Sequence, residues 1–247
     1  MAPAQTVWIA VAAVSALSLV GVSALVVNAP TLRRLVPLLV DFAAGALVGA
    51  ACFDLIPEAW ARHAGALAIA AGLVAGFAAF AGLDRLVHLV PVVPPTEESA
   101  PTTTRTNSSL VVLNLAGDLL HNFVDGALVA ASFLAGPALG VVATLAIALH
   151  ELPRELGSFA IFLHGGVSRG RAIALNALTG VAAFAGAGAT LAVGPRVESL
   201  GAVLLPVAGG TFLYLARAIV LRRPRHAIGV GLFLSGLGIT ALAARLA

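Results

Sequence analysis

Long apolar runs alternate with short polar segments along the whole chain. A helix that crosses a bilayer needs about 20 mostly apolar residues, and each run is close to that length. We therefore predict an all-α integral membrane fold with eight transmembrane helices, forming a single polytopic domain over residues 1–247. The predicted spans are 5–28, 35–57, 64–88, 110–135, 138–163, 171–193, 200–221 and 227–246.

Two segments need a separate interpretation. No positively charged residue precedes the first run, which favours a retained helix over a cleaved signal peptide. The polar segment 91–109 is rich in Pro, Thr and Ser and predicts a flexible linker between the third and fourth spans.

The arginines predict the orientation. With both termini extracytoplasmic, more arginines fall in cytoplasmic segments than outside, as the positive-inside rule requires. The cytoplasmic segments then hold Arg33, Arg34, Arg85, Arg105, Arg169, Arg171, Arg222, Arg223 and Arg225, and the outer segments hold Arg62, Arg196 and Arg245. The linker 91–109 is cytoplasmic in this arrangement.

Composition supports a membrane protein and excludes several other classes. Hydrophobic residues make up 60% of the chain and charged residues 10%, whereas soluble domains carry about 25% charged residues. The arginines are scattered between apolar runs and form no basic face for nucleic acid, and one cysteine cannot form a disulfide framework. A lysine-free chain rich in alanine and arginine suggests a GC-rich bacterial genome, and hence a bacterial inner membrane.

Ionisable residues near the midpoints of two consecutive spans are candidates for a functional site. A charge at the bilayer centre costs on the order of 2.5–3.5 kcal/mol on insertion scales, so such residues are functional candidates by default. They are Asp118, His121 and Asp125 in the fourth span and His150, Glu151, Arg154 and Glu155 in the fifth.

Spacing places these residues on facing helical stripes. Asn114, Asp118, His121, Asn122 and Asp125 follow one another at intervals of 4, 3, 1 and 3 residues, which is one face of a helix.

The fifth-span residues repeat this pattern, with Ser158 one turn further. Only Gly136 and Pro137 separate the spans, so the two helices should be antiparallel neighbours. Imidazole, carboxylate and amide groups around one point suit zinc, with iron, manganese or cobalt as alternatives. The competing interpretation is that these groups pair with one another and only hold two helices together.

These segments resemble the Zrt-, Irt-like (ZIP) family of divalent metal transporters. GDLLHNFVDGALVAASF (117–133) closely resembles the family's fourth-helix signature, and HELPRELGSFAIFL (150–163) resembles its fifth. Weaker similarities lie in GALVGAACFDLIPEA (45–59) and VAGGTFLYLA (207–216). The resemblance implies a ZIP-like bundle with the site on helices 4 and 5. It also implies uptake of divalent metal into the cytoplasm, and a homodimer.

Carried over by position, the resemblance implies two metals. One would bind His121, Asp125 and His150, and the second Asn122, Asp125 and Glu151, with Asp125 bridging them.

Two positions depart from the family pattern. The family carries a metal-binding histidine or bridging glutamate where this chain has Arg154, and often aspartate where it has Ser158. An arginine has five donors and no acceptor and stays protonated, so it cannot bind a metal.

We interpret Arg154 as a fixed cation in the place of the second metal, neutralising Asp125, Glu151 or Glu155. The carboxylates of Asp118, Asp125, Glu151 and Glu155 carry four negative charges when ionised; Arg154 leaves three, and one divalent ion leaves one. The pattern therefore predicts a single exchangeable metal, with zinc preferred and Fe²⁺, Mn²⁺, Co²⁺ or Cd²⁺ as alternatives.

Five further residues have accessory roles in this interpretation. Asp118, Glu155 and Ser158 lie beside the metal site. Asp54 and Glu58, near the outer end of the second span, would line the entrance and attract cations. For Glu58, a simple position at the wet interface is an equal alternative.

Two rival functions remain open at this point. A non-transporting homologue that senses metal or scaffolds partners is suggested by Arg154. An intramembrane metal-dependent hydrolase is the remote alternative, because a zinc protease needs HExxH and this chain reads HELPR (150–154). We therefore predict a transporter and no enzyme.

Overall fold

The computed structural model describes residues 3–17, 29–62, 64–89, 104–194, 197–222 and 226–246, and no strand occurs in these ranges. The helices, in chain order, are α1 (Pro3–Leu17), α2 (Ala29–Ala50), the π-helical segment η2 (Ala51–Leu55), α3 (Ile56–Ala61), α4 (Ala66–Leu89), α5 (Thr104–Ala135), α6 (Pro137–His164), α7 (Arg169–Val193), α8 (Val197–Leu221) and α9 (Ala227–Leu246). The chain is therefore all-helical where it is described, as the apolar runs predict.

Within the described residues, five helical stretches are long and apolar enough to cross a membrane: Arg34–Ala61, Ala66–Leu86, Arg169–Val193, Ala202–Leu221 and Ala227–Arg245. The helices α5 and α6, which carry the polar residues of the predicted site, are not among these five. A shorter apolar helix covers Ala4–Ala16, and residues 18–28 of the predicted first span lie outside the described residues.

The predicted linker 91–109 is shorter than expected, because α5 already begins at Thr104. Ser109 is buried and accepts a hydrogen bond of 2.8 Å from Nη1 of Arg222, just beyond α8. This contact with a neighbouring helix explains why a polar segment continues as helix. Residues 90–103 lie outside the described part of the chain.

The predicted second span contains a change of helical type. Its ordinary α-helix gives way to η2 and resumes as α3, where Pro57 lies in the first turn. Proline has no backbone N–H and clashes with the carbonyl of an earlier turn, which disturbs the α-helical hydrogen-bond pattern just before it. Asp54 lies on η2, so this local change decides where its carboxylate points.

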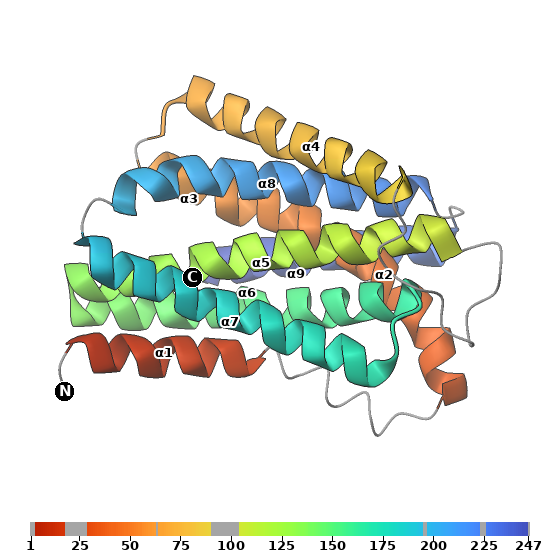
Figure 1. Cartoon of the computed structure of the whole chain (residues 1–247), viewed down its shortest axis with the longest axis horizontal. Helices are drawn as coiled ribbons and strands as arrows, with labels where there is room; N and C mark the ends of the chain where they lie inside the picture. The colour runs from red at the N-terminus through yellow and green to blue at the C-terminus, as the bar shows by residue number, and fades with distance from the viewer. Residues whose placement is uncertain are drawn as a thin grey trace.

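The helices form two groups that lie side by side (Figure 1). In one group α5 packs against α6 and α7, and α1 covers α6 and α7. In the other α2 packs against α9 and α8, and α4 packs against α8. The groups meet where α2 contacts α6 and where α8 contacts α5.

Three helix pairs within the groups approach closely through reciprocal glycines. A Cβ added at any of six glycines would overlap a backbone carbonyl of the partner helix. These glycines are Gly45 and Gly236 between α2 and α9, Gly76 and Gly210 between α4 and α8, and Gly126 and Gly186 between α5 and α7. Small residues at helix contacts are a common way of packing in membranes, where close van der Waals contact stabilises association.

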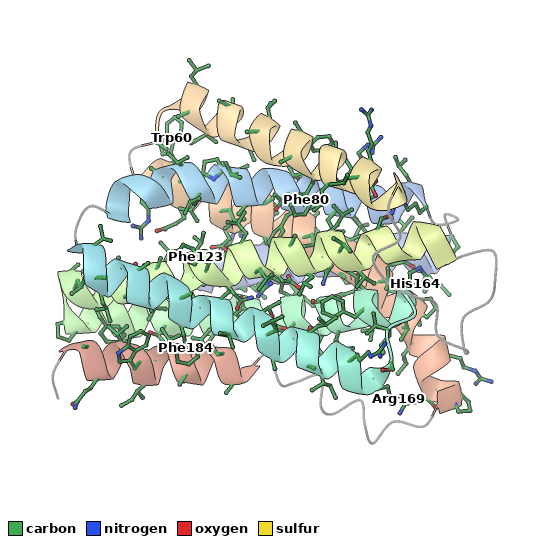
Figure 2. The ribbon with its side chains drawn as sticks, in the orientation of Figure 1. Trp60, Phe80, Phe123, His164, Arg169 and Phe184 are labelled. Carbon is green, nitrogen blue, oxygen red and sulfur yellow. The ribbon has the colours of Figure 1, made fainter. Side chains whose placement is uncertain are left out.

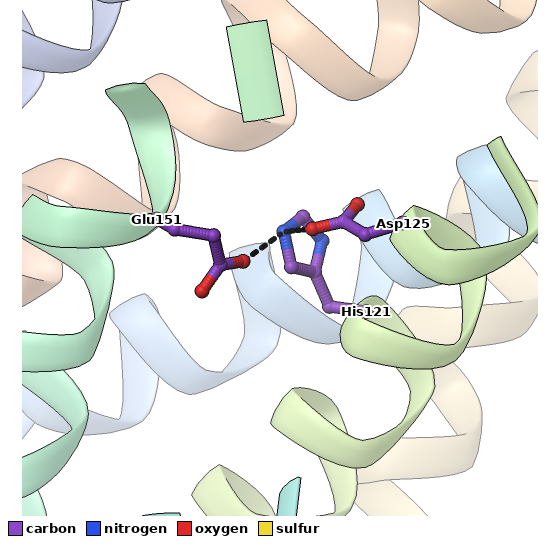
Figure 3. A group of neighbouring side chains, drawn as sticks. All are labelled: His121, Asp125 and Glu151. Atoms are coloured by element: carbon purple, nitrogen blue, oxygen red, sulfur yellow. Dashed lines mark ion pairs between the residues drawn. The ribbon is translucent and has the colours of Figure 1, made fainter. Parts of the chain in front are cut away.

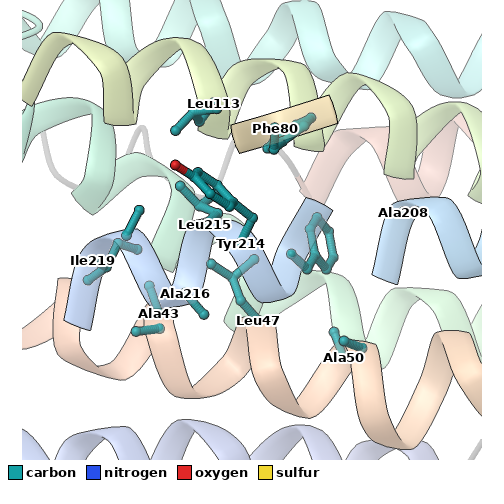
Figure 4. Close-up of a cluster of buried hydrophobic side chains, with 14 of the residues drawn as sticks. Ala43, Leu47, Ala50, Phe80, Leu113, Ala208, Tyr214, Leu215, Ala216 and Ile219 are labelled. Carbon is teal, nitrogen blue, oxygen red and sulfur yellow. The ribbon is translucent and has the colours of Figure 1, made fainter. Parts of the chain in front are cut away.

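Apolar side chains fill the space around these contacts. Leu47 of α2, Phe80 of α4, Leu113 of α5 and Leu215 of α8 meet in one buried cluster (Figure 4). In the other group Phe184 of α7 stacks on Trp8 of α1, with ring centroids 6.1 Å apart (Figure 2 labels Phe184). The predicted site lies between these two cores.

Candidate metal centre

One face of α5 carries a buried stripe of polar residues, each with at most 2% of its surface exposed. The stripe consists of Asn114, Asp118, His121, Asn122 and Asp125. The 3.6-residue periodicity of the helix explains this alignment, and Leu113, Val124 and Val129 of α5 pack among apolar side chains.

A second polar set lies on α6, and it is also buried. Glu151, Arg154, Glu155 and Ser158 have between 1% and 4% of their surfaces exposed. Gly136 alone separates α5 from α6, and Pro137 begins α6 at a position where its missing N–H leaves no bond unmade. The short connection makes the helices neighbours, so the two polar sets meet.

His121, Asp125 and Glu151 form a compact group at this meeting point (Figure 3). Nε2 of His121 lies 3.2 Å from Oδ2 of Asp125 and 3.6 Å from Oε1 of Glu151. One potential ligand atom from each residue lies within 4.8 Å of the others. An imidazole and two carboxylates at this separation have the chemistry and size of a site for zinc or a similar divalent ion.

The imidazole of His121 is also oriented by an aromatic ring. The ring of Phe212, on α8, lies 5.0 Å from it between centroids, tilted by 41°. Both residues are completely buried. The second helix group therefore supplies one wall of the site.

Arg154 contacts this group through Glu151. Its Nη2 donates to Oε1 and Oε2 of Glu151 at 2.6 and 2.5 Å, and its Nε donates to Oε1 at 3.1 Å. Its Nη1 donates to Oδ1 of Asp118 at 2.6 Å, and Nη2 lies 3.4 Å from Oε1 of Glu155. The expected partners Glu151 and Glu155 are found, and Asp118 joins them.

Asp118 has its own set of donors. Nδ2 of Asn114 donates to Oδ2 of Asp118 at 2.9 Å and to Oγ of Ser158 at 2.6 Å, and the Ser158 hydroxyl donates to the same Oδ2. Oγ of Ser158 also lies 3.4 Å from Oδ1 of Asn176, a buried residue of α7. Sequence reasoning missed Asn176, although a lone asparagine in an apolar run is a signal that would have found it.

Asn122 and His150 are the remaining predicted ligands, and the structure describes the side chain of Asn122 only. Asn122 is buried beside His121, and its Nδ2 donates to the backbone carbonyl of Asp118 at 3.0 Å. The side chain of His150 lies outside the described residues, so its role as a ligand stays a prediction. In the described group Glu151 accompanies His121 and Asp125, where the resemblance implied His150.

A cleft of about 500 Å³ extends from the end of α3 to Asp125. Asp54, Glu58 and Arg62 line it, together with small and apolar residues from the end of α5 and the beginning of α6. Glu58 accepts a hydrogen bond of 2.7 Å from Nε of Arg62, so this carboxylate is paired at the surface. The cleft connects the predicted entrance residues with a carboxylate of the buried group.

Comparisons with known proteins identify the family of this chain. The model of the ZIP zinc transporter family matches residues 94–229, which is more than half of the chain and includes both polar stripes.

Three relatives illustrate the extent of the similarity. Zinc transporter ZIP13 of Pongo abelii is 34% identical over 197 residues, covering 74% of this chain and 57% of that protein. Zinc transporter SLC39A7 of Rattus norvegicus is 40% identical over 137 residues, covering 51% of this chain and 29% of that protein. Human zinc transporter ZIP4 is 48% identical over 100 residues, covering 40% of this chain and 15% of that protein. The matches span less than two thirds of each relative, and the family match shows that the chain belongs to the ZIP zinc transporter family.

Proposed function

We propose that this chain moves a divalent metal cation, preferably zinc, across a membrane into the cytoplasm. The observation that carries the proposal is the buried group of His121, Asp125 and Glu151 at the foot of a cleft. Relatives that are named as zinc transporters support both the activity and the metal. Iron, manganese, cobalt and cadmium are the ions to test against zinc.

The metal binds at His121 and Asp125, with Glu151 as a third ligand that it shares with Arg154. Both Glu151 oxygens already accept hydrogen bonds from the guanidinium, so the metal shares a carboxylate that stays anchored. His150 is the candidate for a fourth ligand, because it precedes Glu151 on the same helix. This set gives zinc the mixed nitrogen and oxygen coordination that it accepts in proteins.

Arg154 limits the site to one metal. It binds Glu151 and Asp118 on one side of the His121 group, where the resemblance implied a second ion. A second divalent ion there would meet a fixed positive charge and would lose those carboxylates as ligands. The charge balance calculated from the sequence therefore applies to a single bound ion.

The metal enters from the outer side through the cleft in this proposal. We infer that Asp54 and Glu58 draw cations toward Asp125, and that the metal loses part of its water shell before it binds His121. The arginine distribution along the sequence puts this end of the bundle outside, with both termini extracytoplasmic. We place the chain in a bacterial inner membrane for the compositional reason given above.

Release to the cytoplasm requires the two helix groups to move relative to one another. The reciprocal glycine contacts bind helices within each group, so each group can move as a unit. The site lies at the border, with its ligands on α5 and α6 and Phe212 on α8. Rocking of one group against the other would expose the metal to the inner side, as in other alternating-access transporters.

Zinc uptake into proteoliposomes tests the proposal, with the unmodified chain compared with His121→Ala. Saturable uptake that the substitution abolishes supports transport through this group. Thr240→Val is a matched control, because Thr240 is a buried residue of α9 whose hydroxyl donates to the Gly236 and Leu237 carbonyls of its own helix, each at 3.0 Å. Equal uptake by the His121→Ala protein would contradict the proposal.

A sensor or scaffold is the second candidate, and the bonds between Arg154 and Glu151 favour it. An ion pair that locks α6 in one arrangement would bind metal without passing it on. The two functions differ in one result: a sensor binds zinc in the folded state and gives no saturable uptake. Parallel measurements of binding and uptake on one preparation therefore separate them.

A further inference from the structure

The two departures from the fifth-helix signature, Arg154 and Ser158, bind the same carboxylate. Nη1 of Arg154 donates to Oδ1 of Asp118, while the Ser158 hydroxyl donates to Oδ2. Arg154 and Ser158 lie one helical turn apart on α6, and Asp118 reaches both from α5. Hydrogen bonds to Asp118 of α5 therefore connect Arg154 and Ser158.

Asn114 completes the orientation of Asp118. Its Nδ2 donates to Oδ2 of Asp118 and to the Ser158 oxygen. With both donors on Oδ2, the other oxygen of Asp118 faces Arg154. The space left among Asn114, Asp118, Arg154 and Ser158 is about 10 Å³, no more than a single water needs. The carboxylate is thus fixed by its neighbours and has little room to turn.

The guanidinium of Arg154 lies between this fixed carboxylate and Glu151. It donates to Asp118 through Nη1 and to Glu151 through Nη2 and Nε. Glu151 in turn faces His121 at 3.6 Å. The interaction between Asp118 and the guanidinium therefore competes with the interaction between Glu151 and the same guanidinium. The more strongly Asp118 binds the guanidinium, the less strongly the guanidinium pairs with Glu151.

We propose that Ser158 and Asn114 are positioning residues that orient Asp118 as the anchor of Arg154, and that this anchor keeps Glu151 available to the metal. The inference rests on the proposed function. When the anchor is weakened, the guanidinium pairs more strongly with Glu151, and the metal loses affinity. Neither positioning residue carries a charge, and neither is a ligand of the proposed metal.

A double-mutant cycle between positions 158 and 154 tests the proposal. Zinc affinity of the purified full chain is measured with zinc chloride against a competing chelator, and melting temperature is recorded for each protein. We expect Ser158→Ala to weaken zinc binding about fivefold, which is less than the roughly tenfold or larger effect of a lost hydrogen bond to a charged group, because the change reaches the metal only through Asp118 and Arg154. In the Arg154→Gln background the same substitution leaves the affinity unchanged, because the anchored group is gone.

Two variants separate positioning from structure. Ser158→Thr keeps the hydroxyl and is expected to retain the affinity, while Thr240→Val removes a buried hydroxyl of α9 and leaves the affinity unchanged. Should Ser158→Ala not fold, Asn114→Ala replaces it in the same cycle.

An equal loss of affinity in both backgrounds would overturn this inference alone, as would a lowered melting temperature with unchanged affinity. Absence of zinc binding in the unmodified, folded chain would overturn the proposed function, and this inference with it.

Discussion

Arg154 and Arg222 both bind carboxylates in the bundle, one at its centre and one at its end. Arg154, 4% exposed, contacts Glu151, Asp118 and Glu155. Arg222, which follows α8, donates from Nη2 to both oxygens of Asp84, at 2.7 and 3.0 Å.

Hydroxyl groups also contact Asp84 and its partner, and Arg217 lies over the ring of Tyr214, 5.8 Å from its centroid. The hydroxyl of Tyr214 donates to Oδ2 of Asp84 at 2.7 Å. Ser109 brings a further hydroxyl to Arg222. Among the described residues, the pair of Asp84 and Arg222 is therefore joined by hydroxyl groups. The group around Arg154 instead contains further carboxylates.

The balance of charge separates these two regions. One guanidinium meets three carboxylates at the centre, and Asp125 adds a fourth nearby, so negative charge remains in excess. At the end, Asp84 and Arg222 neutralise one another and connect α4, α5 and α8. We conclude that the central group is suited to bind a cation, whereas the end group is suited to hold helices together.

Replacing an aspartate by asparagine should therefore have different effects in the two groups. The larger effect is expected in the central group, where the substitution should weaken zinc binding. Asp125→Asn keeps the size of the side chain and removes one negative ligand beside His121. We expect zinc affinity to fall at least about 100-fold, since even outer-shell changes at metal sites cost 10–100-fold. Saturable uptake should disappear, and isothermal titration with zinc measures the affinity.

The melting temperature of the Asp125→Asn protein checks the interpretation. Removal of one of several crowded carboxylates lessens their repulsion, so the folded state should not become less stable. If the Asp125→Asn protein is unfolded, or if it binds zinc normally, then Asp125 has only a structural role. The central group and the end group would then not differ in their capacity to bind a cation.

A second prediction concerns the number of metals. Arg154→His removes the fixed cation and supplies an imidazole beside Glu151, Asp118 and Glu155. We expect bound zinc to rise from one to two ions per chain, measured by elemental analysis of protein purified in excess zinc. The unmodified chain is the control, and two ions bound there would refute the single-metal interpretation.

The third prediction is smaller and affects stability. Asp84→Asn weakens the bond to Arg222, and hydrogen bonds to charged groups contribute about 1.5–3 kcal/mol. The melting temperature should fall by roughly 5 °C, while zinc affinity stays unchanged. Tyr214→Phe removes one donor to the same carboxylate and should give a smaller decrease. A clear loss of zinc affinity in the Asp84→Asn protein would connect the end group to binding.

Much of the fold followed from the apolar runs, because a membrane helix must satisfy its backbone hydrogen bonds within itself. The ends of α4, α6, α7, α8 and α9 lie within a few residues of the predicted spans. The start of α5 was missed, because the contact of Ser109 with Arg222 is not visible in local composition. The π-helical segment was also missed, although Pro57, which follows it, is visible in the sequence.

The site was predictable to the level of its helical faces. Periodicity identified the α5 and α6 stripes, and residue types identified metal chemistry. The partners of Arg154 depend on side-chain directions between helices, and Asp118 emerged as one of these partners only from the structure. The glycine contacts also needed coordinates, because sequence does not tell which helix each glycine meets.

The weakest effect is expected at the mouth of the cleft, where Glu58 pairs with Arg62 in contact with solvent. Their side chains are 37% and 19% exposed, and exposed pairs of this kind contribute about 0–1 kcal/mol. Glu58→Gln should therefore leave the melting temperature unchanged and slow zinc uptake about twofold at low ionic strength, because a positive Arg62 remains without its partner. The opposite change, Arg62→Gln, should speed uptake by a similar factor.

Salt distinguishes attraction at a distance from direct binding. Both effects should vanish at about 1 M salt, where charges are screened beyond about 3 Å. Rates that stay slow in high salt would mean that Glu58 itself binds the metal on its way to Asp125. The mouth of the cleft would then bind cations as the buried group does, and would not only attract them.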